Sequence, residues 1–530
     1  MNMMNNLLSS STLPITICAT FLFLYVLFWL RRSKTSTTGV APKKTPPEVA
    51  GAWPLIGHLH LLSGSQPPHV TLGKLADKYG PIFTLRLGVH RTLVVSSYEM
   101  AKECFTVNDK AFASRPKSVA FEILGYNFSM IGFSPYGSYW RTMRKIATVH
   151  VLSAHRTETL LKDVMESEVK IAMKESYEFW EKMKNNKDRN ERAITEMKKW
   201  FGDIAINVLF RTVVGKRFDG DEEENQRIRK ALRGLFDLTG SFVICDTLPY
   251  LRWLDLDGKE KEMKKTAKVL DEFVCVWLDQ HKRNRKPAGG EHDFMDVLLS
   301  TVDDQDLDGR DSDTAIKATC LALILAGTDT TAGTLTWILS LLLNNREVLS
   351  KATQELDAQV GMENMAIKSD LTKLKYIQAI IKETLRLYPP APLNVPHESI
   401  EDCTVGGYHI PAGTRLLTNF SKLQRDPMLY SDPLEFRPER FLTTHMNVDV
   451  KGQHFELIPF GVGRRMCPGI SFALQLMQIT LATLLHGFDI VTSDEEPVDM
   501  AEHNGLTTIK ASPLQVVLTP RLSAQTFSQN

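Results

Sequence analysis

The segment Phe460-Gly461-Val462-Gly463-Arg464-Arg465-Met466-Cys467-Pro468-Gly469 decides how the rest of this chain is interpreted, because it places one cysteine in a tight, glycine-rich loop. Gly463 and Gly469 permit backbone angles and close approaches that side chains would block. Pro468 removes a backbone donor and stiffens the chain after the cysteine. Backbone N–H groups in such a loop can point at the sulfur and stabilise a thiolate. The largely apolar residues 470–474 predict a helix that starts directly behind the sulfur, where the helix dipole favours negative charge.

A lone cysteine is most often a small buried hydrophobic residue with no chemical role. This one belongs to the pattern Phe-x-x-Gly-x-Arg-x-Cys-x-Gly. The pattern resembles the haem-binding loop of the cytochrome P450 superfamily. The resemblance implies that Cys467 is the axial thiolate ligand of the iron in haem b, a ligand type that promotes O–O cleavage. It also implies that Phe460, Arg465 and Gly469 belong to the cofactor site.

The composition allows a large core and argues against several functions. Of 530 residues, 43% are hydrophobic and 24% are charged. The net charge of +1 gives no sign of a nucleic-acid partner. Seven cysteines lie far apart without a Cys-x-x-Cys pair, which indicates neither a zinc site nor a disulfide framework. This cysteine usage fits a reducing compartment.

Residues 12–30, TLPITICATFLFLYVLFWL, form an uncharged apolar run that is long enough to cross a bilayer. Arg31 and Arg32 follow at once, and no basic residue precedes the run. The positive-inside rule therefore leaves the rest of the chain in the cytosol. A cleaved signal peptide is the alternative, but the run lacks a basic start and a clear small-residue cleavage site. We predict an uncleaved transmembrane anchor within residues 1–30.

A hinge and one large domain are predicted after the anchor. Residues 31–60 are basic and then rich in proline, and the consecutive prolines Pro46-Pro47 stiffen the chain. They resemble the hinge of membrane-anchored, plant microsomal members of the superfamily. Residues 61–530 are predicted to be a single haem-binding monooxygenase domain. The resemblance implies a mainly α-helical fold with small β-sheets, and a single-pass protein of the endoplasmic reticulum membrane with a cytosolic catalytic domain.

A long helix is predicted over residues 313–345, because its centre is apolar on all sides and should lie in the interior. A second membrane span is the alternative, but Asp329 would then lie in the bilayer at a cost of a few kcal/mol. The threonines beside it can bond back to carbonyls, bending the helix and widening a turn. The sequence AGTDTT at 326–331 resembles the oxygen-activation motif of the superfamily. The resemblance implies that Asp329 and Thr330 relay protons through water; a simple Thr/Asp cluster at a helix break is the alternative.

Further residues are predicted to contact the cofactor. Trp140 and Arg144 are four apart and share one face of a predicted helix. In the superfamily this spacing gives an indole N–H and a guanidinium to a haem propionate, and an arginine fork matches a carboxylate. The pair alone is common on amphipathic helices. The resemblance implies, less specifically, that Arg115 and His397 also contact propionates.

An ion-pair network is predicted beneath the cysteine loop. Glu383 and Arg386 are three apart on a strongly apolar helical segment, so they share a face. Arg440 of the sequence Pro-Glu-Arg-Phe offers a third member. The resemblance implies that the three charges are buried together. Because removing one partner from a buried network costs roughly 3–5 kcal/mol, we assign them a structural role in seating the haem.

Two hairpins are predicted outside the helices. Residues 81–88 and 91–96 are rich in β-branched residues, and the turn between them contains glycine. Residues 408–411 and 415–418 are also strand-like, and Ala412-Gly413 is the predicted turn between them.

The motifs occur in the order of the superfamily, and the resemblance implies an NADPH-driven monooxygenase that uses O2 as co-substrate. Electrons would come from a membrane NADPH–cytochrome P450 reductase, because the sequence carries no flavin or nicotinamide motif. The substrate would be a small apolar plant metabolite, such as an alkaloid, coumarin, flavonoid or terpenoid. The predicted substrate pocket consists of apolar residues: Leu323, Ala326, Val395 and Leu506.

Two other functions remain open at this stage. A haem-thiolate isomerase or dehydratase would act without a reductase, although such relatives depart from the acid–alcohol pair that this chain keeps at Asp329 and Thr330. The second alternative is a membrane-tethered protein that binds haem but catalyses no reaction. The sequence names neither the substrate nor the position that is attacked.

Overall fold

The computed structural model describes residues 19–21, 23–24, 43–159, 161–185, 193–218, 221–241, 243–247, 249–284, 293–494, 496–503 and 505–528. The chain divides into two units, Met1–Lys44 and Thr45–Asn530. Most of the predicted anchor lies outside the described residues. Those described in it, 19–21 and 23–24, are helical and exposed. The membrane anchor therefore stays a prediction.

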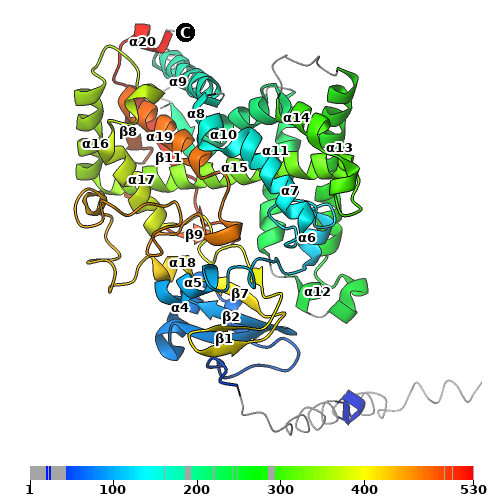
Figure 1. Cartoon of the computed structure of the whole chain (residues 1–530). Helices are drawn as coiled ribbons and strands as arrows, with labels where there is room; N and C mark the ends of the chain where they lie inside the picture. The colour runs from blue at the N-terminus through cyan, green and yellow to red at the C-terminus, as the bar shows by residue number, and fades with distance from the viewer. Residues whose placement is uncertain are drawn as a thin grey trace, which may run out of the picture. The chain divides into compact units, whose positions relative to one another are not determined.

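Helices make up most of the larger unit (Figure 1). They are α3 (Leu59–Leu62), α4 (Pro68–Tyr79), α5 (Tyr98–Phe105), α6 (Val119–Ile123), α7 (Ser138–Ala147), α8 (Ala154–Thr159), α9 (Leu161–Asn185), α10 (Met197–Val214), α11 (Glu222–Gly240), α12 (Ile244–Thr247), α13 (Lys259–Arg283), α14 (Phe294–Thr301), α15 (Ser312–Asn344), α16 (Arg346–Gln359), α17 (Lys375–Leu387), α18 (Phe420–Leu423), α19 (Ile470–Gly487) and α20 (Ala524–Ser528). The predicted helix behind the cysteine is confirmed as α19.

The strands form small sheets. They are β1 (Ile82–Leu87), β2 (His90–Val95), β3 (Ile194–Glu196), β4 (His397–Glu398), β5 (Cys403–Val405), β6 (Tyr408–Ile410), β7 (Arg415–Thr418), β8 (Phe488–Thr492), β9 (Glu502–His503), β10 (Ile509–Lys510) and β11 (Gln515–Pro520). One sheet has the order β1-β2-β7-β4 and another β3-β11-β8, while β5-β6 and β9-β10 are two-stranded. The mainly helical fold with small sheets is confirmed.

One predicted hairpin is confirmed and the other is wrong. β1 and β2 pair antiparallel, with Ile82 opposite Val95. β6 does not pair with β7; it pairs antiparallel with β5, through the turn Gly406-Gly407. Both glycines have positive φ, 58° and 74°, which suits a tight two-residue hairpin turn. β7 instead lies parallel to β2, a strand more than 300 residues earlier in the chain.

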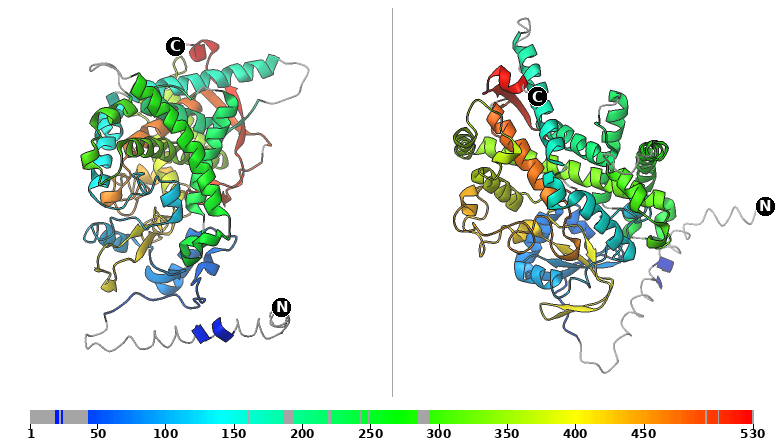
Figure 2. Two further views of the ribbon diagram at one scale, coloured as in Figure 1. Left: turned by 90° about the vertical axis from the view of Figure 1, so that its right-hand side faces the viewer. Right: turned by 45° about the horizontal axis from the view of Figure 1, so that its top comes forward.

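Helix α15 forms the centre of the helical part and is the long helix that the sequence predicts. It contacts α10, α17 and α19, and Figures 1 and 2 show it crossing between them. Asp311 caps its N-terminus by accepting a hydrogen bond from the backbone N–H of Thr314. Most of its residues from 315 to 343 are buried. Residues 326–330 are partly or fully exposed, and Ala326, Gly327 and Thr330 among them line the cavity described below.

Two helices in the described part of the chain are long and apolar enough to cross a membrane, α15 and α19. In their most apolar windows, 67% and 72% of the residues are buried inside the protein. Such burial is what core helices require, so we interpret both as part of the interior.

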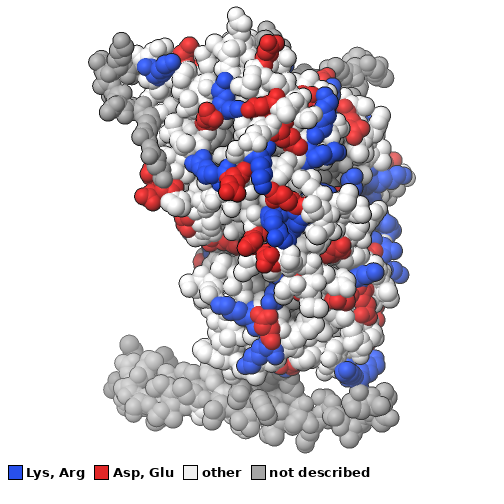
Figure 3. Space-filling view, turned by 90° about the vertical axis from the view of Figure 1, so that its left-hand side faces the viewer, with Lys and Arg blue, Asp and Glu red and all other residues white. Residues whose placement is uncertain are grey.

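The charged surface is mixed. Figure 3 shows Lys and Arg side chains interspersed with Asp and Glu over the face that it presents. This pattern agrees with the near-neutral net charge of +1 and gives no basic patch on that face for a polyanion.

Candidate active site

A cavity of about 320 Å³ lies between α15, the cysteine loop, the segment after α17 and the C-terminal loop around Leu506. Most residues predicted for the cofactor and the substrate pocket line it: Arg115, Trp140, Arg144, Leu323, Ala326, Thr330, Val395, Phe460, Arg465, Cys467, Gly469 and Leu506. The remaining predicted residues, Asp329, His397 and the ion-pair network, are not on its wall. Sequence reasoning missed several residues of the wall, such as Phe133 and Phe236.

Cys467 lies just before the N-terminus of α19, which begins at Ile470. Its backbone N–H donates a hydrogen bond to the carbonyl of Phe460, 2.9 Å away, which closes the loop. Burial raises the pKa of the Cys467 thiol, while the backbone N–H of Gly469 and the charge of Arg144 act to lower it. The sulfur thus has a donor and a cation beside it, as a thiolate ligand needs.

The two predicted loop glycines have different roles. Gly463 has a φ of +71°, and a Cβ there would lie 2.3 Å from Oδ1 of Asp109. Asp109 in turn holds Arg464 by a salt bridge of 2.6 Å. Gly469 has an ordinary φ of −92°, so the prediction of an unusual backbone angle is wrong there. A Cβ on Gly469 would lie 3.9 Å from the Cys467 sulfur, so this glycine matters for its closeness to the sulfur.

Three arginines from distant parts of the sequence meet at one end of the cavity. Arg115 is buried and donates to the carbonyls of Val395 at 2.6 Å and Pro396 at 2.9 Å. Arg144 donates to the carbonyl of Met466, next to the cysteine. Arg465 is also buried and donates to three more backbone carbonyls, those of Ala113, Ile131 and Ser134.

This arginine cluster has no acidic side chain on the described wall of the cavity. Burial and the neighbouring arginines lower the pKa of Arg465 to about 8, and burial with Arg144 lowers that of Arg115 to about 9. Buried charges are ordinarily paired, so the cluster is one that needs an anion. Haem b carries two propionate carboxylates beside a flat apolar ring. The residues present therefore fit that cofactor: a sulfur, an apolar cavity and a cationic edge.

Trp140 supports the arginine cluster through its ring. Its indole N–H donates to the carbonyl of Ile131 at 3.1 Å. The guanidinium of Arg465 lies 4.3 Å from the ring centroid, and that of Arg144 lies 5.3 Å from it. Cation–π contacts of this kind stabilise partly desolvated guanidinium groups. The structure thus gives the indole N–H a backbone partner, and the ring face holds the arginines in position.

His397 lies beside the arginine cluster and not on the cavity wall. It is 3% exposed, and its Nδ1 lies 2.7 Å from the carbonyl oxygen of Phe112. Burial and the charges of Arg115 and Arg465 hold the pKa of His397 well below its usual range. A neutral histidine here avoids adding a further positive charge to the cluster.

The centre of α15 remains α-helical through residues 326–331, so the predicted widened turn is not present. The threonines do bond back, as predicted: Thr328 donates to the carbonyl of Ile324 at 2.7 Å and Thr330 to that of Ala326 at 2.5 Å. Thr330 lines the cavity. Its hydroxyl proton is therefore engaged by the helix, and the oxygen can accept a hydrogen bond from the cavity side.

Asp329 points away from the cavity, toward a group of polar side chains. Its carboxylate lies 3.1 Å from Nη1 of Arg233 on α11 and 3.5 Å from Nζ of Lys198 on α10. The hydroxyl of Thr507 donates to its other oxygen at 3.1 Å. The Asp329 side chain is 13% exposed. No local sequence signal links these partners to Asp329, because each of them is more than 90 residues away from it along the chain.

The three members of the predicted ion-pair network meet in the interior. Arg386 donates to both oxygens of Glu383 at 2.7 and 2.8 Å, and Arg440 donates to one of them at 3.0 Å. All three side chains are at most 1% exposed. Gln424 accepts from the backbone N–H of Ile458 and donates to the carbonyl of Arg386, so it links the network to the chain entering the cysteine loop.

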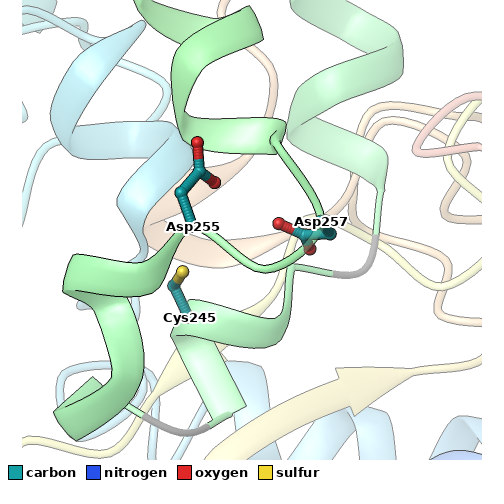
Figure 4. Close-up of side chains that lie close together, drawn as sticks. All are labelled: Cys245, Asp255 and Asp257. Carbon is teal, nitrogen blue, oxygen red and sulfur yellow. The ribbon is translucent and has the colours of Figure 1, made fainter.

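A second cluster of possible metal ligands, Cys245, Asp255 and Asp257, lies near the start of α13 (Figure 4). Asp255 accepts hydrogen bonds from the backbone N–H groups of Glu260 and Lys261. Asp257 accepts from the N–H of Ile244 at 3.0 Å. Both carboxylates thus satisfy helix-start and loop donors. We interpret this cluster as a structural turn.

Known proteins resemble this chain over nearly its whole length. A family model for cytochrome P450 matches residues 46–518. A strychnine-10-hydroxylase of Strychnos nux-vomica is 52% identical over 98% of this chain and 99% of its own length. A flavonoid-6-hydroxylase of Ocimum basilicum is 52% identical over 96% of each chain. Among solved structures, a zebra fish cytochrome P450 with progesterone has a TM-score of 0.72 at 24% identity, covering 86% of this chain and all of that one.

Proposed function

The chain belongs to the cytochrome P450 family and is a plant monooxygenase, and from this premise we propose that it inserts one oxygen atom of O2 into an apolar specialised metabolite. The observation that carries the proposal is the shared cavity: Cys467, the arginine cluster and Thr330 all line it. A sulfur ligand, an anion-binding edge and a hydroxyl thus face one apolar space.

The cofactor would be haem b, held by this chain at three kinds of contact. Cys467 would ligate the iron, and Arg115, Arg144 and Arg465 would pair with the propionates. When bound, the haem supplies the activation of O2 with electrons that NADPH provides through a reductase. The mostly apolar wall suits the flat ring and offers few polar positions to water.

The substrate is expected to be a neutral, largely apolar polycyclic compound. The wall above the cysteine is formed by Leu323, Ala326, Val395 and Leu506, with the aromatic rings of Phe133 and Phe236. Apolar pockets with few polar groups bind by area and shape. Two similar proteins are named for an alkaloid and for flavonoids, which supports a metabolite of the alkaloid, flavonoid, coumarin or terpenoid kind.

Protons would be supplied by Asp329 and Thr330. The carboxylate lies next to two cations and a hydroxyl that reaches the cavity, and Thr330 offers its oxygen to a cavity water. A carboxylic acid beside a water chain can act as a general acid.

The protein would work at a membrane. We assign the anchor to residues 1–30, the hinge to 31–60 and the catalytic domain to 61–530. Residues 12–30 would hold the chain in the endoplasmic reticulum membrane, with the catalytic domain in the cytosol. There it would meet an NADPH–cytochrome P450 reductase, for which Lys145 and Arg464 on the thiolate side could supply positive charge. Fluorescent fusions with and without residues 1–30 would test this: loss of the membrane signal is expected without them, and unchanged membrane retention would contradict the anchor.

The main experiment combines a spectrum with a product screen. The purified protein, reduced and exposed to carbon monoxide, should show the red-shifted Soret band of a thiolate-bound haem. Microsomes with reductase should then convert members of a metabolite panel to products one oxygen atom heavier. Product without NADPH or reductase would instead support an isomerase or dehydratase, and haem binding without any turnover would support a non-catalytic haem protein.

Thr330→Ala tests the proton role. It should divert NADPH oxidation toward hydrogen peroxide by about tenfold or more, as expected when a group that assists proton transfer is lost. Thr328→Ala is the matched control, because Thr328 bonds back along the same helix but does not line the cavity. Equal product per NADPH in the wild type and Thr330→Ala would remove the proposed role.

A further inference from the structure

The carboxylate of Asp329 is cut off from the cavity by its own orientation. In the described part of the chain, its partners are Arg233, Lys198 and Thr507. Of these three, only Thr507 lines the cavity. The hydroxyl of Thr330 is directed to the carbonyl of Ala326. The direct side-chain link from the acid to the cavity is therefore the Thr507 hydroxyl, 3.1 Å from Oδ2 of Asp329.

The loop that carries Thr507 is fixed on both sides of it. The backbone N–H of Thr508 donates to the carbonyl of Pro390 at 2.9 Å, and its carbonyl accepts from the indole N–H of Trp337 at 3.0 Å. On the other side Leu506 packs against Gly240, where a Cβ would lie 2.3 Å from the Leu506 nitrogen. The Thr507 side chain is thus held between α15, α11 and the segment after α17.

We propose that Thr507 is a positioning and proton-relay residue that connects Asp329 to the substrate cavity. While Asp329 is ionised, the Thr507 hydroxyl donates to the carboxylate. When Asp329 is protonated, the direction of this bond reverses: the acid O–H donates to the Thr507 oxygen, and the Thr507 hydroxyl donates to a cavity water. The acid then passes its proton to the Thr507 oxygen as Thr507 releases its own proton to that water, and the water gives one of its protons to the group that is protonated in the cavity. Asp329 is left ionised and takes its next proton from solvent. This inference rests on the proposed role of Asp329.

The chain offers matched variants for a test. Thr507→Val keeps the shape and removes the hydroxyl, and Thr507→Ser restores a hydroxyl. Thr508→Val is the control, since the buried Thr508 hydroxyl has no hydrogen-bond partner in the described structure. With the haem-loaded protein and reductase, Thr507→Val should release about tenfold more peroxide per product, as expected for loss of a proton-transfer group. Substrate affinity from spectral titration should change less than about twofold, Thr507→Ser should resemble the wild type, and so should Thr508→Val.

A measurement independent of turnover is the thermal unfolding midpoint in a double-mutant cycle. Thr507→Val should lower the midpoint in the wild-type background but not in the Asp329→Ala background, because the bond it removes is already absent there. Thr508→Val should give the same shift in both backgrounds. An equal shift of the midpoint for Thr507→Val in both backgrounds would mean that the Thr507–Asp329 hydrogen bond does not couple the two residues, and it would overturn the proposed relay.

Asp329→Asn separates this inference from the function that underlies it. If Asp329→Asn releases peroxide and Thr507→Val does not, the role of Thr507 is wrong while that of Asp329 stands. If neither variant changes the yield of product per NADPH, the proposed role of Asp329 fails and the relay fails with it. If both release peroxide and Thr507→Ser restores the yield, the relay is supported.

Discussion

The described part of this protein holds two groups of buried arginines, and these groups differ in whether they have a carboxylate partner. Arg386 and Arg440 share the carboxylate of Glu383, with all three side chains at most 1% exposed. Arg115 and Arg465 are buried nearly as well, yet their hydrogen bonds go to backbone carbonyls. The first group is complete without a ligand. The second has no carboxylate on the described wall of the cavity, which is what a place reserved for an anionic cofactor requires.

Glu383→Gln should have the largest effect on stability. The substitution keeps the size of the side chain and leaves two buried guanidinium groups without a negative charge, which costs roughly 3–5 kcal/mol. Chemical denaturation of the haem-loaded variant against the wild type measures this. A loss below about 1 kcal/mol would mean that the buried ion pairs contribute no more than exposed ones do.

The loss of stability caused by Arg465→Met should depend on haem. This would distinguish the arginine cluster from the Glu383 ion pairs, which need no ligand. In the haem-loaded protein the substitution should remove the proposed charge-assisted bond to a propionate, worth about 1.5–3 kcal/mol, whereas in the haem-free protein it removes bonds to carbonyls only. Its cost should therefore be about 2 kcal/mol greater with haem than without. Denaturation of both forms, together with the rate of haem loss to a scavenger protein, measures the difference.

Arg464→Gln is the control for that prediction. Arg464 is next to Arg465 in the sequence, but it forms a salt bridge with the carboxylate of Asp109. Its cost should be the same with and without haem. If Arg465→Met also costs the same in both forms, the arginine cluster does not bind the cofactor.

His397 should make the haem-free protein sensitive to acid. Its pKa in the folded state is lowered by burial and by Arg115 and Arg465, so below about pH 6.5 the unfolded state binds a proton that the folded state does not. Stability should then fall as the pH drops, by about 1.4 kcal/mol per unit. The unfolding free energy between pH 7 and 5.5, compared between wild type and His397→Gln, isolates this contribution from other histidines.

Haem should weaken that dependence, because propionates bound at the arginines, as proposed, would offset their positive charge at His397. An acid slope that is unchanged in His397→Gln would show that the histidine does not titrate in this way.

Lys282→Gln should have the smallest effect. It breaks a salt bridge of 2.5 Å to Asp313 in which both side chains are about two-fifths exposed. Water screens such a pair, so the expected loss is about 0–1 kcal/mol. Comparing the unfolding free energies of Lys282→Gln and Glu383→Gln tests whether burial, and not the number of ion pairs, sets the loss of stability. A loss for Lys282→Gln as large as that for Glu383→Gln would contradict this.

The hairpin error shows where local pattern stops being sufficient. β7 has the residues of a strand, and the prediction paired it with the nearest strand before it. The two glycines at 406–407 fitted a tight turn better than Ala412-Gly413 did, and they pair β6 with β5. The pairing of β6 with β5 therefore has a local signal in its turn residues. The parallel pairing of β7 with β2 depends on packing across more than 300 residues, for which the sequence carries no local signal.

The sequence alone determined the parts whose physics is local: the glycine-rich loop around Cys467, the helix behind it, the long apolar helix and the spacing of Glu383 and Arg386. These follow from backbone angles, helical period and burial of apolar residues. Only the tertiary structure decided which way Asp329 points, that Arg233, Lys198 and Thr507 meet it, and that three distant arginines converge where the described cavity wall carries no acid. Such contacts arise when separate elements pack together, because the charge of a site is a sum over neighbours in space and not along the chain.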